Sequence, residues 1–273
     1  MSLRWYLARK KDPYYRMAKR ERYRSRAAYK LLQLQERFGV IRPGDVVVDL
    51  GASPGGWSQV AASLAGPRGL VVAVDRARMA PLEGVFFVRG DLRSPSTRER
   101  VMEALGTRRA DVVISDMSPH ISGNYSIDHA RSIELCEAAL SFARQCLRRG
   151  GGFVAKVFEG DMFREFLKKL ERDFRNCRAH HPPASRKSSS EVYVVCKGFK
   201  GGHGVGGDKG GRGGGNMAGA GVRAGFGAGG GGEVGGDWVG GEGVKAGIHR
   251  ERMRSRRNGS WSPEWTNWEG EEE

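Results

Sequence analysis

Short runs of apolar, mostly β-branched residues alternate along the chain with stretches that have helical spacing. The runs that predict strands lie at 46–50, 70–74, 85–88, 111–115, 153–158 and 191–196. Apolar residues three and four positions apart predict helices over about 25–38, 57–64, 95–105, 127–146 and 163–174. This alternation predicts an α/β fold, a mostly parallel, doubly wound sheet with helices on both faces.

The first predicted strand runs into a glycine-rich turn. Residues 45–57 read DVVVDLGASPGGW, and Gly51, Gly55 and Gly56 allow the backbone to turn sharply and to approach a ligand closely. In doubly wound sheets, ligands bind beyond the carboxyl ends of the strands. An ordinary strand-to-helix turn has a similar glycine pattern, so the turn alone does not identify a ligand.

Acidic residues follow the later predicted strands and narrow the choice of ligand. Asp75, Asp91 and Asp116 stand at three further strand ends. A carboxylate after the second strand can accept hydrogen bonds from both ribose hydroxyls of an adenosine, and Asp91 can meet the adenine amino group. Because the turn lacks the G-x-G-x-x-G pattern of dinucleotide sites, we expect S-adenosylmethionine rather than a pyrophosphate cofactor. Its sulfonium already activates the methyl group, so methyl transfer needs a base and alignment, and we expect no metal.

A lysine lies inside the predicted buried strand FVAKVF. An unpaired ammonium there would cost several kcal/mol, so Lys156 should face carboxylates or emerge at the ligand crevice. Asp116 and Glu191, at neighbouring strand ends, are the expected partners. Lys30, at the border of the inward face of helix 25–38, would complete a set of two lysines and two carboxylates. A salt bridge with a purely structural role is the alternative.

Four ordered motifs carry a family resemblance: VDLGASPGGWSQVA, SDMSP, VAKVFEG and SSSEVYVVCKGFK. Over roughly residues 14–199 the chain resembles the FtsJ/RrmJ family of ribose 2′-O-methyltransferases. The resemblance implies a Rossmann-like class I methyltransferase fold with one antiparallel strand near the end of the sheet. The residues that it implies for binding S-adenosylmethionine are Gly55, Trp57, Asp75, Asp91 and Asp116. Those that it implies for catalysis are Lys30, Asp116, Lys156 and Glu191. His120 departs from the family pattern, because many members have Asn there.

The charge of the chain points to an RNA substrate. The formal net charge is +15, and residues 1–26 contain ten Lys or Arg and only two acidic residues, interleaved with Trp5, Tyr6, Tyr14, Tyr15 and Tyr23. Such a segment suits phosphate contacts and base stacking. The resemblance implies methylation of a uridine ribose in large-subunit ribosomal RNA. Three alternatives remain open: a transfer RNA 2′-O-methyltransferase, an inert RNA-binding ribosome assembly factor, and a small-molecule methyltransferase.

Composition predicts three segments: a basic aromatic arm (1–24), a catalytic domain (25–199) and a disordered tail (200–273), since 26 of the 42 glycines follow Lys200. The four cysteines have no C-x-x-C spacing, and we expect buried free thiols in a reducing cytoplasm. No apolar run is long enough to cross a bilayer. We therefore expect a cytoplasmic monomer whose partner is ribosomal RNA or the large ribosomal subunit.

Overall fold

The computed structural model describes residues 12–186 and 189–201. The chain divides into two units, Met1–Lys209 and Gly210–Glu273, and all described residues belong to the first. The predicted tail therefore lies outside the described residues except for Lys200 and Gly201, and the predicted arm is described only from Asp12 onward.

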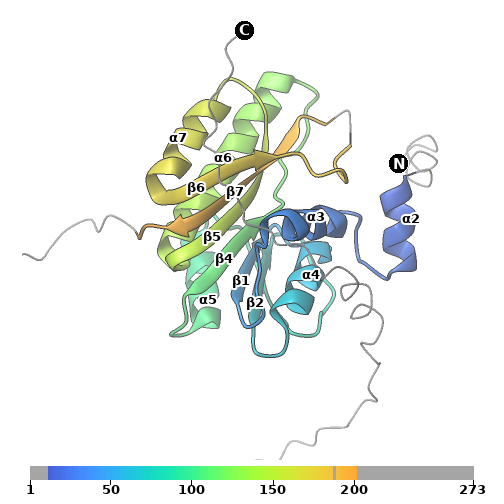
Figure 1. Ribbon diagram of the computed structural model, residues 1–273, viewed down its shortest axis with the longest axis vertical. Helices are drawn as coiled ribbons and strands as arrows, with labels where there is room; N and C mark the ends of the chain where they lie inside the picture. The colour runs from blue at the N-terminus through green and yellow to red at the C-terminus, as the bar shows by residue number, and fades with distance from the viewer. Residues whose placement is uncertain (1–11, 187–188, 202–273) are drawn as a thin grey trace, which may run out of the picture. The chain divides into compact units, whose positions relative to one another are not determined.

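A seven-stranded sheet in the order β3-β2-β1-β4-β5-β7-β6 forms the centre of this unit (Figure 1). Its strands are β1 Val46–Leu50, β2 Leu70–Asp75, β3 Val85–Arg89, β4 Ala110–Ser115, β5 Leu147–Phe158, β6 Phe174–His180 and β7 Glu191–Phe199. β3, β2, β1, β4 and β5 pair in parallel, whereas β7 is antiparallel to both β5 and β6. The prediction of a mostly parallel sheet with one antiparallel strand is confirmed.

Helices cover both faces of the sheet, as predicted. They are α2 Pro13–Arg20, α3 Ala28–Phe38, α4 Gly56–Ala65, α5 Pro95–Leu105, α6 Tyr125–Cys146 and α7 Phe163–Asp173. α5, α6 and α7 pack on one face and α3 and α4 on the other. β1 supplies both cores by alternation: Val46 and Val48 join the α6 side, and Val47 joins the α3 side. Full burial of such a side chain contributes about 1.5–3 kcal/mol.

Part of the predicted arm is folded. α2 begins with Pro13, and the Asp12 side chain caps it by accepting a hydrogen bond from Tyr15 N at 3.2 Å. Ala18 of this helix packs with Tyr29 of α3 and with Ala184. Sequence reasoning missed α2 because charged residues interrupt its few apolar positions. Residues 13–20 are therefore docked on the α3 side of the sheet.

Strand β6 was also missed, and its cysteine corrects a prediction. Its sequence, FRNCRAH, has no apolar alternation because it forms an edge with several exposed side chains. The register sets Cys177 directly opposite Cys196 of β7, with 4.1 Å between the Cα atoms, and the two form a disulfide. The prediction of free thiols is wrong for this pair. Cys136 and Cys146 are free and buried.

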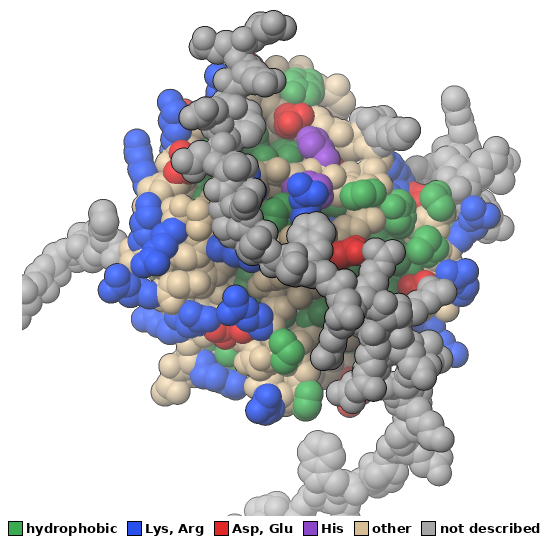
Figure 2. Space-filling model, in the orientation of Figure 1, with side chains coloured by type: hydrophobic (Ala, Val, Ile, Leu, Met, Phe, Trp, Pro, Cys, Tyr) green, Lys and Arg blue, Asp and Glu red, His purple; other side chains and the backbone are tan. Residues whose placement is uncertain are grey.

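The surface of the described part is rich in Lys and Arg. Figure 2 shows these side chains spread over the visible face, with fewer acidic ones among them. Within residues 12–186 and 189–201, none of the helices combines the length and apolar character that a membrane crossing requires.

Candidate functional site

A cavity of about 310 Å³ opens at the carboxyl ends of the parallel strands. The residues that line it include Gly51 after β1, Asp75 of β2, Asp91 after β3 and Asp116 after β4. The predicted strand-end carboxylates are thus brought together around one space. Leu135 and Ala138 of α6 form part of its apolar wall. Its volume lies in the range that suits a nucleoside-sized ligand.

The glycine turn shapes the floor of this cavity. Gly51 has φ +78°, and a Cβ there would lie 2.5 Å from Met117 Cγ, so both backbone conformation and space require glycine. Ser53 N donates to Asp75 Oδ2 at 2.9 Å, and Ala77 N donates to Asp75 Oδ1 at 2.7 Å. Each carboxylate oxygen keeps a lone pair, so Asp75 is oriented and still able to accept hydroxyl protons.

Asp91 is already engaged by a neighbouring arginine. Arg93 Nη2 donates to Asp91 Oδ2 at 2.7 Å, and Arg93 Nε donates to Oδ1 at 3.1 Å. These hydrogen bonds hold the pKa of Asp91 at about 2, despite the opposing effect of burial. Contact between Asp91 and an amino group therefore requires Arg93 to share this carboxylate or to move.

Gly55 and Trp57 are not among the residues that line the cavity. Gly55 precedes α4, with φ +108°, and faces Arg24 and Met79. The Trp57 side chain is 2% exposed and packs in the core between α3, α4 and the sheet. Their predicted contact with a cofactor stays a prediction.

Two lysines and two carboxylates meet on the face of the sheet that α3 covers. In β5, Val154 belongs to the core under α3, and the alternation places Lys156 on the same face. Tyr193 of β7, the register partner of Lys156, belongs to that core too, and Glu191 precedes it by two residues. Asp116 follows the last residue of β4, and Lys30 comes from the first turn of α3.

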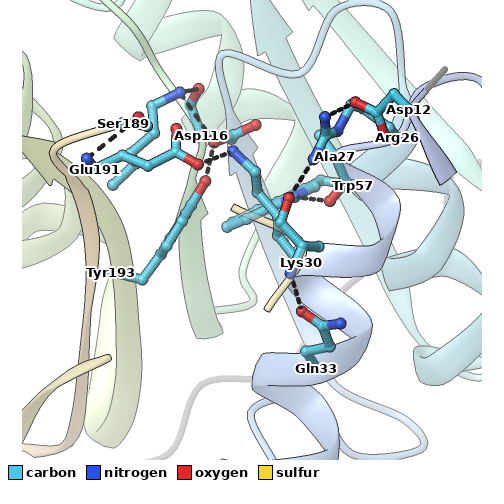
Figure 3. Close-up of polar contacts among 12 residues, drawn as sticks. Asp12, Arg26, Ala27, Lys30, Gln33, Trp57, Asp116, Ser189, Glu191 and Tyr193 are labelled. Carbon is cyan, nitrogen blue, oxygen red and sulfur yellow. Dashed lines mark hydrogen bonds and ion pairs between the residues drawn. The ribbon is translucent and has the colours of Figure 1, made fainter. Parts of the chain in front are cut away.

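Short polar contacts connect these four residues in pairs. Lys156 Nζ lies 3.0 Å from Asp116 Oδ1 and donates to the Asp116 carbonyl at 2.8 Å. Lys30 Nζ forms an ion pair with Glu191 Oε1. Lys30, Lys156 and Glu191 are each less than a tenth exposed. Figure 3 shows the Lys30 side chain reaching from α3 toward Asp116 and Glu191. The structure thus brings together all four residues predicted for catalysis.

The electrostatics of the cluster keep Asp116 ionised. Burial raises the pKa of Asp116, but the ammonium groups of Lys156 and Lys30 and the hydrogen bond from Tyr193 outweigh it, so the pKa is lower than its ordinary value. A buried carboxylate that stays charged can hold a lysine side chain in a fixed position.

Sequence reasoning missed Tyr193. Its hydroxyl donates to Asp116 Oδ1 at 2.7 Å, and its ring centroid lies 5.5 Å from Lys30 Nζ. Burial, together with the Asp116 carboxylate, raises the pKa of Tyr193 well above its usual range, so the hydroxyl stays a donor. The signal was present in the sequence, because a residue two positions after Glu191 in a strand must share its face.

A second cavity, of about 390 Å³, adjoins the other side of the cluster. Arg26, Ala27, Lys30, Arg186, Ser189 and Glu191 line it. Lys30 and Glu191 thus face this second space, whereas Asp116 faces the first. The cluster lies between the two cavities, although Lys156 itself lines neither. The lining of the first cavity has three carboxylates and two guanidinium groups, and that of the second has three cationic side chains and one carboxylate.

Comparison with known proteins identifies the family. The profile of the FtsJ-like methyltransferases matches residues 23–199. The chain belongs to this family. A Ribosomal RNA large subunit methyltransferase E from Methanothrix thermoacetophila is 54% identical over 187 residues, which cover 68% of this chain and 72% of the relative. The protein of the same name from Archaeoglobus fulgidus is 53% identical over 191 residues, covering 70% and 97%.

A solved structure supports the fold of this FtsJ-like methyltransferase. A protein described as a ribosomal RNA methyltransferase from Plasmodium falciparum superposes with a TM-score of 0.59 at 28% identity, covering 66% of this chain and all of that one. The predicted Rossmann-like methyltransferase fold and the family resemblance are therefore confirmed. In the described part of the chain, no group of three or more His, Cys, Asp or Glu has the arrangement of a metal site.

Asp49 of β1 lies behind the carboxylate cavity of this FtsJ-like methyltransferase. The residue is fully buried; its Oδ2 accepts a hydrogen bond from Ser58 Oγ at 2.6 Å, and its Oδ1 has no hydrogen-bond partner among the described residues. Burial, with smaller contributions from the Asp116 and Asp75 carboxylates, raises the pKa of Asp49 to about 7.

The raised pKa of Asp49 predicts a pH-dependent stability. Between its ordinary value of 3.8 and about 7, the folded protein keeps a proton that the unfolded chain releases. As the pH rises through that window, ionisation of Asp49 in the unfolded chain lowers the free energy of unfolding by at most about 1.4 kcal/mol per pH unit. In urea denaturation, the free energy of Asp49→Asn minus that of the unaltered protein should rise from pH 4 to 7 and then level off. Parallel pH curves for the two proteins would contradict this.

Proposed function

We propose that this protein transfers a methyl group from S-adenosylmethionine to a ribose 2′-hydroxyl of RNA, and that its substrate is a uridine of large-subunit ribosomal RNA. The observation that carries the proposal is the place of the lysine–carboxylate cluster between the two cavities. One cavity suits an adenosine and the other an anionic polymer, and a base stands between them. The names of the relatives at about half identity point to the same substrate.

The carboxylate cavity fits S-adenosylmethionine by the chemistry of its donors and acceptors. Asp75 has acceptor capacity for ribose hydroxyls and Asp116 for the cationic end of the molecule. Asp91 can accept from the adenine amino group once Arg93 shares its carboxylate or moves. When bound, S-adenosylmethionine supplies a methyl group that its sulfonium has already activated. Gly55 and Trp57 complete the proposed set, through the position of the turn that they follow.

Lys156 is the proposed general base. A ribose hydroxyl is a weak nucleophile, so the site must remove its proton and align it. The hydrogen bond to the Asp116 carbonyl and the ion pair with the Asp116 carboxylate fix Lys156 Nζ beside a residue that lines the carboxylate cavity. For this role Lys156 would first lose its ammonium proton to solvent. The neutral amine would then accept the hydroxyl proton as the oxygen takes the methyl group, and the bond between that methyl and sulfur would break to leave a neutral thioether. The charged groups of Lys30, Asp116 and Glu191 surround Lys156 and fix its position.

The cationic cavity is the proposed entrance for RNA. A 2′-hydroxyl stands beside the 3′-phosphate of its own ribose, so a base that reaches the hydroxyl needs cationic groups close by. Arg26 forms an ion pair with Asp12 and donates a hydrogen bond to the Ala184 carbonyl. These two contacts fix the orientation of its guanidinium group. Arg186 lies near enough to contribute to the lowered pKa of Arg26, after burial. Two adjacent guanidinium groups favour a bound phosphate.

All four catalytic side chains come from a single chain, which supports a monomer as the acting form. We further propose that it acts in the cytoplasm, because its proposed substrate belongs to the large ribosomal subunit.

Replacement of Lys156 tests the proposed base. Lys156→Met keeps the packed stem and removes the amine, so methyl transfer should fall about 10²- to 10⁴-fold, the usual contribution of a general base. Binding of S-adenosylmethionine, measured by calorimetry without RNA, should change little. Lys169→Met on α7, which loses the same charge, should keep the normal rate. A Lys156→Met rate near that of the unaltered protein would eliminate Lys156 as the base.

The exposed cations of α2 test the proposed RNA contacts. Arg16, Lys19 and Arg20 are exposed. Replacing all three with Gln should weaken RNA binding and reduce the slope of log K against log salt by about 2, if each contacts a phosphate of a single strand. The matched control replaces the exposed Arg164, Lys168 and Arg172 of α7 with Gln. Equal effects of the two sets would mean that net charge alone, and not α2, determines binding.

A further inference from the structure

The segment Gly55-Gly56-Trp57 is packed against residues 24–27, which lead into α3. A Cβ on Gly56 would lie 2.2 Å from Ser25 Oγ, and one on Gly55 would lie 2.9 Å from Arg24 Cδ. Trp57 Nε1 donates to the Ala27 carbonyl at 2.8 Å. These three consecutive residues are thus in contact with the segment that precedes Lys30 in the chain.

Trp57 fixes the start of α3. Ala27 is the N-cap residue of this helix, and its side chain makes no capping hydrogen bond. Its carbonyl accepts two donors, the Trp57 indole and Lys30 N, the latter at 3.0 Å. Because Lys30 is in the first turn, any shift of the Ala27 carbonyl moves the Lys30 backbone with it.

Trp57 also supports Tyr193. The two ring centroids are 5.7 Å apart at an interplanar angle of 33°. The Tyr193 ring in turn lies beside the Lys30 ammonium, and its hydroxyl holds Asp116. Figure 3 shows Trp57 beside Ala27 on one side of the cluster, with Tyr193 reaching toward Asp116 from the other. One buried indole therefore contacts both supports of the catalytic group.

We propose that the Trp57 side chain has a positioning role: it sets Lys30 and Tyr193 in place. Gly55 and Gly56 supply the space in which residues 24–27 sit against it. The turn that bounds the cofactor cavity and the lysine at the RNA cavity are then parts of one packed unit. This inference rests on the proposed function, since it concerns the alignment of the same catalytic cluster.

The test separates alignment from cofactor binding. Trp57→Phe keeps an aromatic ring next to Tyr193 but removes the hydrogen bond to Ala27. The rate of RNA methylation at saturating S-adenosylmethionine should fall about 10- to 100-fold, as expected for a small misplacement of a catalytic group. The Kd for S-adenosylmethionine, measured without RNA, should stay within about twofold. Trp57→Ala, which also removes the ring, should lower the rate further if it folds.

The matched control is Gln35→Met in the same helix. Gln35 Nε2 donates to the Ile41 carbonyl at 2.8 Å and Gln35 Oε1 accepts from Ile41 N at 2.8 Å, so this variant removes two side chain to backbone hydrogen bonds at the far end of α3. This variant should lose stability but keep the normal rate. An unchanged rate in Trp57→Phe, or a loss explained entirely by a higher Kd, would overturn the proposal. Absence of methylation by the unaltered protein would instead reject the proposed function itself.

A second pair of variants tests the contact between Gly56, at the start of α4, and Ser25. Gly56 has helical backbone angles, so Gly56→Ala introduces only the collision with Ser25. The rate should fall in Gly56→Ala and recover when Ser25→Gly is added. A loss that Ser25→Gly does not restore would count against the packed unit.

Discussion

The burial of the Lys156 ammonium beside the Asp116 carboxylate is the interaction on which the site depends. Removing one partner of such a pair costs about 3–5 kcal/mol, because an uncompensated charge remains in the interior. The pair therefore holds the end of β4 against β5. Cys136 of α6 adds a contact from the opposite face, since its thiol donates to the Lys156 carbonyl at 2.9 Å. Contacts from the sheet and from helices on both of its faces thus fix the position of the Lys156 ammonium.

The connectivity of the sheet explains why the cofactor cavity lies next to this pair. After β1 the chain moves outward through β2 and β3, then crosses to β4 on the other side of β1. Loops at such a switch point diverge and leave a crevice at the carboxyl edge. Gly51 and Asp116 border that crevice, so the residue that pairs with the proposed base also lines the proposed cofactor cavity. In the proposed reaction, the proximity of the two reactants follows from this strand order.

Much of this could be predicted from the sequence, because apolar runs and buried charges carry strong signals. The strands of the core, the three strand-end carboxylates and the four-residue cluster were found in this way. α2 and β6 were missed, since an exposed helix and an edge strand have little apolar pattern. The Cys177–Cys196 disulfide depends on the register of β6, which no local pattern gives. To predict the role of Tyr193, one has to assign each residue of β7 to a face of the sheet. To predict the contacts of Trp57, one has to know where α3 packs.

The most direct test of the central claim is transfer of a labelled methyl group from S-adenosylmethionine to RNA, with ribosomal, transfer and small-molecule acceptors compared. Ribosomal RNA from cells that lack this gene is the acceptor of choice, since the target is then unmethylated. Nuclease mapping should place the label on a ribose 2′-oxygen of one uridine in the large-subunit RNA. Label on a base, label on transfer RNA or a small molecule only, or no transfer at all would contradict the account.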